Sequence, residues 1–305
     1  MNIDNLLIEL SHNCNLNCIM CGYGQGVSHP DRFMTIELFY YIMEKIGHKA
    51  KNIRLNGRGE STIHPNFLEI VRYLNKNYVS IHLSLFSNLS FRDDKIIDAL
   101  MNQNIELYIS FDSPFKETLL EIRRNSNFEN IISNINQLMK KRNRPFIVFT
   151  LQELNWHSIV DISEFALNNN LNLIYNVVRK DQGFEEFVSI IIENKNAIKS
   201  AFMEVEKKFK KSDLICKIPD QIAGVRLFEE KFNKTISNII NCPLIEKEIC
   251  ICYDGEILPC NMFNTHSYGY IRNSSIVDIK KQIQIFKDLQ PEHYYCKNCA
   301  YIGSN

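Results

Sequence analysis

Short apolar runs alternate with amphipathic segments over the first 180 residues of the chain. The apolar runs, which are typical of buried strands, cover residues 5–10, 52–57, 78–87, 105–111, 146–151 and 171–178. Segments with apolar residues at the i, i+3, i+4 and i+7 spacing of a helix lie between or after them, at 35–48, 66–77, 92–103, 127–142 and 156–170. Because strands and helices alternate, the pattern predicts an α/β fold built from six parallel βα units.

Six such units can form an open doubly wound sheet or a partial barrel, and the strand pattern alone does not decide between them. In both architectures the loops at the carboxyl ends of the strands hold the active site. Residues that directly follow a predicted strand are therefore the first candidates for chemistry.

The pattern changes twice beyond residue 182. Residues 183–240 predict helices and a connecting segment, and residues 241–305 contain six of the ten cysteines. Asp254-Gly255 between two apolar stretches predicts a β-hairpin in this tail. We therefore expect three parts: a core over 1–182, a helical connection over 183–240 and a small cysteine-rich domain over 241–305.

The composition limits the binding partners and the cell compartment that we expect for the chain. It has 305 residues, 45% of them hydrophobic, and a formal net charge of +0 from 35 basic and 35 acidic residues. This balance gives no electrostatic reason to expect binding to nucleic acid or to an anionic membrane. No apolar run approaches 18 residues, and the amino terminus, with Asp4 and Glu9, does not resemble a signal peptide. We expect a cytoplasmic protein.

Ten cysteines in a reducing compartment point to metal or cluster ligation and away from disulfides. Three of them, Cys14, Cys18 and Cys21, follow the first predicted strand in the stretch "CNLNCIMC" with the spacing C-x3-C-x2-C. Structural zinc usually takes four protein ligands, whereas three thiolates on a four-iron cluster leave one iron open for a ligand. The trio therefore favours an iron–sulfur cluster that binds a further molecule.

This motif, directly after the first strand of a (βα)6 pattern, resembles the radical S-adenosylmethionine (SAM) superfamily. The resemblance implies a partial (β/α)6 TIM-like barrel and a [4Fe-4S] cluster on Cys14, Cys18 and Cys21 that binds SAM. Met20 departs from the family pattern, which often has an aromatic residue before the third cysteine. In this family the cluster reduces SAM, and the resulting 5′-deoxyadenosyl radical abstracts hydrogen from an unactivated C–H bond. A flavodoxin- or ferredoxin-type protein is the implied electron donor.

Two further stretches after predicted strands resemble SAM-binding parts of the family. Gly57, Gly59 and Glu60 end the second strand, where the backbone of family members binds the methionyl amino group; glycine suits a close backbone approach because it has no Cβ. Asn88 ends the third strand and would face the cofactor, although Leu89 stands where the family often has glycine.

The fourth strand and the segment after it carry two more resemblances. Ser110 and Asp112 in "LYISFDSP" match the family's Ser-x-Asp pattern. Either Arg123 or Arg124 matches the arginine that can pair with the carboxylate of SAM.

The cysteine-rich tail looks like a twitch domain, the short relative of the SPASM domain, in which a β-hairpin and a helix hold one auxiliary [4Fe-4S] cluster. The resemblance assigns Cys242, Cys260, Cys296 and Cys299 as its ligands. Because the chain stops six residues after Cys299, we expect one auxiliary cluster rather than two. Zinc held by the same four cysteines is the alternative.

Three cysteines stay outside these ligand sets. Cys250 and Cys252 are two residues apart on a predicted strand and so share one face. They can be core thiols, alternative cluster ligands or hydrogen-atom donors. Cys216 is isolated, and we expect it to pack in the core.

The sequence is compatible with two classes of substrate. We favour oxidation or epimerisation of a small sugar- or cyclitol-like molecule, because Cys14 leaves no room ahead of the barrel for a leader-peptide-binding domain. The alternative is maturation of a ribosomally made peptide by a thioether or C–C crosslink or by epimerisation. A third hypothesis, of another class, is a non-catalytic iron–sulfur or zinc scaffold.

Overall fold

The computed structural model describes residues 3–21, 30–102, 104–178, 189–190, 193–219, 221–222, 225–226, 242, 245–260, 266–290 and 296. Cys299 lies outside these residues, as do large parts of the predicted connection over 183–240 and of the tail.

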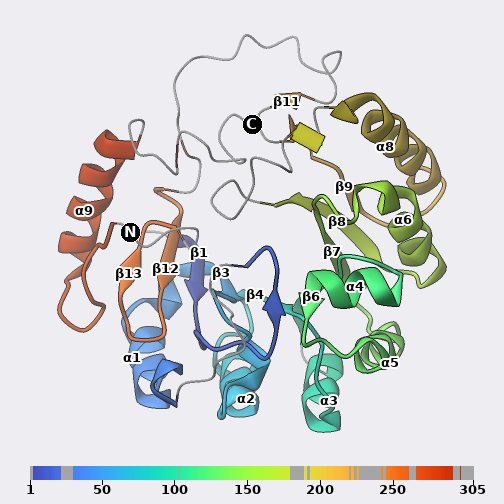
Figure 1. Ribbon diagram of the computed structural model, residues 1–305. Coiled ribbons are helices and arrows are strands. Elements are labelled where there is room, and N and C mark those ends of the chain that lie inside the picture. Colours follow the sequence, from blue (N-terminus) through green and yellow to red (C-terminus); the bar gives the residue numbers. More distant parts are fainter. Residues whose placement is uncertain are drawn as a thin grey trace.

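A largely parallel sheet forms the centre of the molecule, with the strand order β13-β12-β1-β3-β4-β5-β7-β8-β9 (Figure 1). Every neighbouring pair is parallel except the antiparallel pair β12 and β13. The strands are β1 (Ile3–Ile8), β3 (Ala50–Leu55), β4 (His82–Ser87), β5 (Ile105–Ser110), β7 (Phe146–Leu151), β8 (Asn172–Val177), β9 (Cys216–Lys217), β12 (Glu248–Ile251) and β13 (Ile257–Leu258). The six strands predicted from the sequence are confirmed, and the curved parallel sheet is consistent with a partial TIM-like barrel.

The helices lie along the outer side of the sheet (Figure 1). The five predicted helices correspond to α1 (Ile36–Ile46), α2 (Phe67–Asn77), α3 (Asp94–Asn102), α5 (Phe128–Leu138) and α6 (Ile159–Asn168), the last preceded by the 3-10 turn η4 (Trp156–Ser158). Side chains fix some of their starts: Thr35 accepts from the backbone of α1, and Asn127 from that of α5. Two later helices are α8 (Lys195–Phe209) and α9 (Ile276–Leu289), and α4 (Lys116–Ile122) is a short one that the pattern did not predict.

Several one-turn and two-residue elements complete the described fold. They are β2 (Asn17–Cys18), β6 (Arg123–Arg124), β10 (Gln221–Ile222), β11 (Val225–Arg226), η1 (Pro30–Arg32), η2 (Gly47–Lys49) and η3 (Ser61–Ile63). The pair β2–β6 is important for the site, because it joins the segment that carries the three cysteines to the end of α4.

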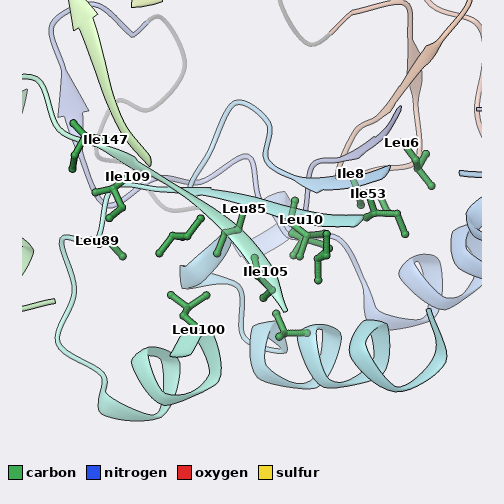
Figure 2. Packing of buried hydrophobic residues seen from close by; sticks show 14 of the residues in the cluster. Leu6, Ile8, Leu10, Ile53, Leu85, Leu89, Leu100, Ile105, Ile109 and Ile147 are labelled. Carbon is green, nitrogen blue, oxygen red and sulfur yellow. The ribbon is translucent and has the colours of Figure 1, made fainter. Parts of the chain in front are cut away.

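The main core lies between the sheet and the helices. On β5 the side chains of Ile105, Leu107 and Ile109 are buried, whereas those between them are only half-buried. Figure 2 shows this layer, with Leu85 and Ile105 among the apolar side chains that meet the helices. The half-buried side chains therefore belong to the opposite, inner face of the sheet, and they can line a substrate site.

The tail hairpin extends the barrel sheet. β12 runs parallel to β1, with Leu6 paired to Ile249 and Ile8 to Ile251. The turn between β12 and β13 contains Gly255 at φ +89°, so the predicted Asp254-Gly255 hairpin is confirmed. The carboxyl end of β12 thus lies beside the carboxyl end of β1, where the three-cysteine segment begins.

The region predicted as helical beyond residue 182 also contributes a strand. β9 pairs with β8 through Leu173 and Cys216, and the Cys216 side chain packs against the main core, as expected. Within the described part of the chain, no helix is both long enough and apolar enough to cross a membrane.

Candidate functional site

The segment of residues 11–21, called here the cysteine loop, lies at the carboxyl ends of β1, β3 and β4. The backbone N–H of Glu60 donates to Asn13 O over 2.8 Å, and the Asn15 side chain donates to Ser90 O over 2.9 Å. On its far side the Ile19 N–H donates to Ile122 O over 2.9 Å, next to the β2–β6 pair. The loop is therefore held from several elements in the position that the fold reserves for catalysis.

The three thiols of Cys14, Cys18 and Cys21 are half-buried on this loop, and none of the cysteines in the described ranges forms a disulfide. Burial raises the pKa of Cys14 to about 12 and that of Cys18 to about 11. Such thiols stay protonated in an apo protein, whereas a bound metal ion deprotonates its thiol ligands. Three soft donors that share one sheltered loop fit an iron–sulfur cluster with one iron left for another ligand.

Other groups do approach the backbone closely at Gly57 and Gly59, as predicted. In this structure those groups are protein atoms of residues 9–13. A Cβ on Gly59 would lie 2.3 Å from Asn13 O and 2.4 Å from Ser11 O, and one on Gly57 would meet the Glu9 side chain at 2.4 Å. The glycines thus let the turn after β3 pack directly under the cysteine loop. Their contact with SAM stays a prediction.

We expect Gly59→Ala to lower the free energy of unfolding by about 1–3 kcal/mol, the usual effect of overpacking, since both clashing oxygens belong to the backbone. Urea denaturation of the two proteins measures the difference. Gly47→Ala is the control, because its Cβ would meet side chains and no backbone atom, mainly the flexible end of Met43 and then the Tyr78 ring at 3.3 Å, and its φ of −56° suits alanine. Equal effects of the two substitutions would contradict the tight contact between the loops.

The Glu60 carboxylate joins the ends of β3 and β4 through hydrogen bonds. It accepts from the Thr62 hydroxyl over 2.7 Å and from the Asn88 N–H over 2.9 Å. Burial raises the pKa of this carboxyl group, and these hydrogen bonds oppose the shift. Its side chain is therefore occupied with holding the rim, and its backbone N–H with holding the cysteine loop.

Asn88 lies beside the first cysteine. Its side-chain amide donates to Asn15 Oδ1 over 2.9 Å and lies 3.9 Å from Cys14 Sγ. Leu89, which replaces the family's glycine, has φ +52°, in the left-handed region that favours glycine. Its side chain is fully buried, and burial offsets the backbone strain. The departure at Leu89 thus leaves the Asn88 side chain beside Cys14, and its contact with SAM stays a prediction.

The side chain of Arg123 lies beside Cys18 of the cysteine loop, whereas Arg124 is paired with Asn17 of this loop through its backbone. The Arg123 guanidinium lies 2.7 Å from Asp112 Oδ2 and 3.9 Å from Cys18 Sγ, while Arg124 is exposed. Burial raises the pKa of Asp112, and the charge of Arg123 opposes that shift. The Nε of Arg123 is buried and has no hydrogen-bond partner among the described residues, so the group has donor capacity left beside Cys18.

Ser110 is the last residue of β5, and Asp112 follows the strand by two residues. Asp112 is fully buried and accepts from the Thr150 N–H over 2.6 Å, so it serves to hold Arg123. Ser110 is half-buried on the inner face, where its hydroxyl can meet a ligand.

Arg58 is a residue of this region that the sequence analysis missed. It donates to both carboxylate oxygens of Glu9, over 2.9 and 3.1 Å, and to Cys252 Sγ over 3.0 Å. It therefore ties the glycine turn to the end of β12. The sequence shows Arg58 between two glycines. It does not show the partners of Arg58, which are 49 and 194 residues away along the chain.

Cys250 and Cys252 share one face, as predicted, and form a small apolar cluster with Leu7 and Leu258. Burial raises the pKa of both thiols. The ligand atoms of Cys252, Asp254 and Glu256 lie within 4.8 Å of one another, but Arg58 already donates to this thiol. Their roles as ligands or hydrogen-atom donors stay predictions.

The predicted auxiliary ligands that the structure describes lie against the main core. Cys242 and Cys260 are half-buried, Cys296 is buried, and Cys299 is outside the described residues. The pKa of Tyr268 is raised by burial and further by the thiols around it, which are Cys250, Cys242, Cys260 and Cys296. The fold therefore collects tail cysteines that are far apart in sequence around one phenol.

The family model described as the Radical SAM superfamily matches residues 8–166, which run from the last residue of β1 through the cysteine loop to most of α6. The chain therefore belongs to the radical SAM superfamily.

Several relatives match nearly the whole chain, and they include the following two. The tungsten-containing aldehyde ferredoxin oxidoreductase cofactor-modifying protein of Pyrococcus furiosus is 24% identical, with 97% of this chain and 86% of that protein covered. The antilisterial bacteriocin subtilosin biosynthesis protein AlbA of Bacillus subtilis is 26% identical, with 97% of this chain and 67% of that protein covered.

Among solved structures, Streptococcus suis SuiB bound to S-adenosylmethionine superposes with a TM-score of 0.73 at 12% identity, with 98% of this chain and 71% of that one covered. SuiB bound to its precursor peptide SuiA gives a TM-score of 0.71. At this identity the likeness shows a shared fold.

Proposed function

We propose that this chain is a radical SAM enzyme in which Cys14, Cys18 and Cys21 hold a [4Fe-4S] cluster and SAM binds at its open iron. The observation that carries the proposal is the cysteine loop itself, with three sheltered thiols at the carboxyl rim of a parallel sheet. When bound, the reduced cluster supplies the electron that splits SAM and so provides the carbon radical that removes hydrogen from the substrate.

The residues around the loop give the chain its part in this chemistry. Asn88 offers a side-chain amide next to Cys14, and Arg123 offers a guanidinium next to Cys18, positions suited to the polar groups of SAM. The carboxylate of SAM fits the buried Nε of Arg123 that has no partner in the described ranges. Glu60 accepts a hydrogen bond from the Asn88 N–H, and Asp112 pairs with Arg123, so the two carboxylates hold Asn88 and Arg123 in place.

For the substrate we favour a peptide. One similar structure is SuiB bound to the precursor peptide SuiA, and one relative, AlbA, is named for the biosynthesis of the bacteriocin subtilosin. The half-buried inner face of the sheet can accept a side chain of such a peptide.

A small polar molecule is the second candidate. It is supported by the Pyrococcus relative, which is named for modifying a cofactor, and by Ser110, whose half-buried side chain ends β5 on the inner face. Oxidation or epimerisation of a sugar-like compound is the reaction that we expect in this case.

We further propose that Cys242, Cys260, Cys296 and Cys299 hold an auxiliary [4Fe-4S] cluster. Support comes from the described cysteines of this set: Cys296 is buried in the main core, and Cys242 and Cys260 pack against it. A flavodoxin or ferredoxin as electron donor stays a prediction. The tests below can also show that the tail holds zinc, or that the protein is a non-catalytic scaffold.

Anaerobic reconstitution with iron and sulfide, followed by dithionite and SAM, tests the function. We expect 5′-deoxyadenosine and about eight iron atoms per chain, four for each cluster. About four iron atoms and one zinc per chain would mean that zinc occupies the tail in place of the auxiliary cluster. A cluster-loaded protein that forms no 5′-deoxyadenosine would favour the non-catalytic scaffold. Stimulation of this product by candidate peptides, compared with sugars and cyclitols, separates the two substrate classes.

We expect Cys296→Ala to keep part of the SAM cleavage but to lose about four iron atoms per chain and most of the substrate conversion, because it removes one auxiliary ligand. Iron analysis and product assays measure both effects. Cys216→Ala is the control, since this thiol packs against the core near β8. Full iron content and normal turnover in Cys296→Ala would show that this cysteine binds no cluster.

A further inference from the structure

Tyr268 lies on a short extended segment whose backbone is fixed against β13. The Tyr268 N–H donates to Ile257 O, and the Ile257 N–H donates to Gly269 O, both over 2.8 Å. Tyr268 is 2% exposed, whereas Tyr270, which shares its face of the segment, is 45% exposed. The phenol of Tyr268 is therefore buried by the His266 and Phe286 rings that pack against it, and its place is well defined.

The ring and the hydroxyl of Tyr268 have different surroundings. The ring packs against His266 and Phe286, with centroid distances of 5.8 and 6.2 Å. The hydroxyl oxygen is buried and finds no hydrogen-bond partner in the part of the chain that the structure describes. A buried hydroxyl without a partner is destabilising, and phenylalanine would give the same ring contacts without that penalty. The tyrosine at this position therefore suggests a partner that is not a protein group.

The surroundings of the hydroxyl indicate which chemistry that partner has. Cys242, Cys260 and Cys296 pack in the same core cluster as Tyr268. Cys260 lies two residues after Leu258 of β13, the strand against which Tyr268 is fixed, and Cys250 is paired with Leu258. After burial, these four cysteines are the groups that raise the pKa of the Tyr268 phenol, which agrees with this placement. These cysteines are therefore the candidate partners of the hydroxyl.

We propose that the Tyr268 hydroxyl donates a hydrogen bond to a sulfur atom of the auxiliary cluster held by Cys242, Cys260 and Cys296, and that this bond raises the reduction potential of that cluster. The inference rests on the proposed function. A donor to sulfur draws electron density from the cluster and stabilises its reduced, more negative form. Such tuning suits a cluster that accepts an electron, so the inference also favours net oxidation of the substrate over a purely structural tail.

Tyr268→Phe tests the proposal because it removes one oxygen atom and keeps the ring. In redox titrations of the reconstituted protein followed by electron paramagnetic resonance, we expect the auxiliary cluster of this variant to have a more negative reduction potential than in the wild type. Tyr270→Phe, which removes an exposed hydroxyl two residues away, should leave the potential unchanged. Equal potentials in wild type and Tyr268→Phe would overturn the inference.

The melting temperature of the cluster-free protein separates hydrogen bonding to the cluster from a general structural role. Without the cluster, Tyr268→Phe should melt at or above the wild-type temperature, because it removes an unpaired buried hydroxyl. With the cluster loaded, this advantage should disappear or reverse. A variant that is equally destabilised in both states would overturn the proposal, whereas one that is stable when cluster-free but no longer retains the second cluster would support it.

The same samples distinguish this inference from the function on which it rests. A wild-type protein that takes up only the amino-terminal cluster contradicts the auxiliary cluster itself. A wild-type protein that takes up both clusters, with an unchanged potential in Tyr268→Phe, contradicts only the role of Tyr268.

Discussion

Replacing any one of Cys14, Cys18 or Cys21 by alanine is expected to reduce the formation of 5′-deoxyadenosine from SAM to below detection. Each substitution leaves two thiols on the cysteine loop, too few to keep a four-iron cluster with one defined open iron. Chromatography of the reaction products after anaerobic reconstitution and reduction by dithionite measures the loss.

The comparison variant for these substitutions is Cys216→Ala, which also removes a thiol but from the core beside β8. It should load iron and cleave SAM as the wild type does. Cleavage retained in any single variant of the loop would mean that this cysteine is not a ligand, and the assignment of the trio would be wrong.

Arg123→Met is expected to lower the free energy of unfolding by about 3–5 kcal/mol, the usual cost of leaving one member of a buried ion pair unpaired. Asp112 is fully buried, and the Arg123 guanidinium 2.7 Å away is the cation that the structure places against it. Urea denaturation of the cluster-free protein measures the effect without any contribution from SAM.

The neighbouring Arg124→Met provides the matched control, because this arginine is exposed, and its effect should stay within about 0.5 kcal/mol. The double variant Asp112→Leu/Arg123→Met should recover part of the stability, since it removes both buried charges together. Similar losses from the two single arginine substitutions would contradict the buried pair.

Much of the fold could be predicted because each strand of the parallel sheet has its own apolar run. The start of β4 was placed too early: residues 78–81 contain Tyr78, whose N–H donates back to the last turn of α2, and Val79, which is 77% exposed. An apolar residue in a turn cannot be told from one in a strand by composition. Boundaries set by hydrogen bonds were therefore less predictable than the elements themselves.

Pairings between distant segments could not be predicted. β9 has two residues and no periodicity, and β12 has only four, so their places beside β8 and β1 depend on tertiary contacts. The same limit applies to Arg58, whose partners Glu9 and Cys252 come from other strands. Tyr268 is similar, because its burial and its unpaired hydroxyl follow from packing against β13 and α9.

The candidate site was more predictable than its supporting contacts. The spacing of Cys14, Cys18 and Cys21 after the first strand indicated the cluster directly. Glu60 and Asp112 were found through their place at strand ends, but their roles in holding Asn88 and Arg123 required coordinates. The choice between Arg123 and Arg124 likewise depended on which side of a two-residue strand faces Cys18.

Electron paramagnetic resonance of the reduced, oxygen-free protein, recorded before and after the addition of SAM, tests the central claim most directly. We predict a four-iron signal that depends on the cysteine loop and that changes when SAM binds to its open iron. A protein that shows no four-iron signal, or one whose signal is unaffected by SAM, would contradict the account.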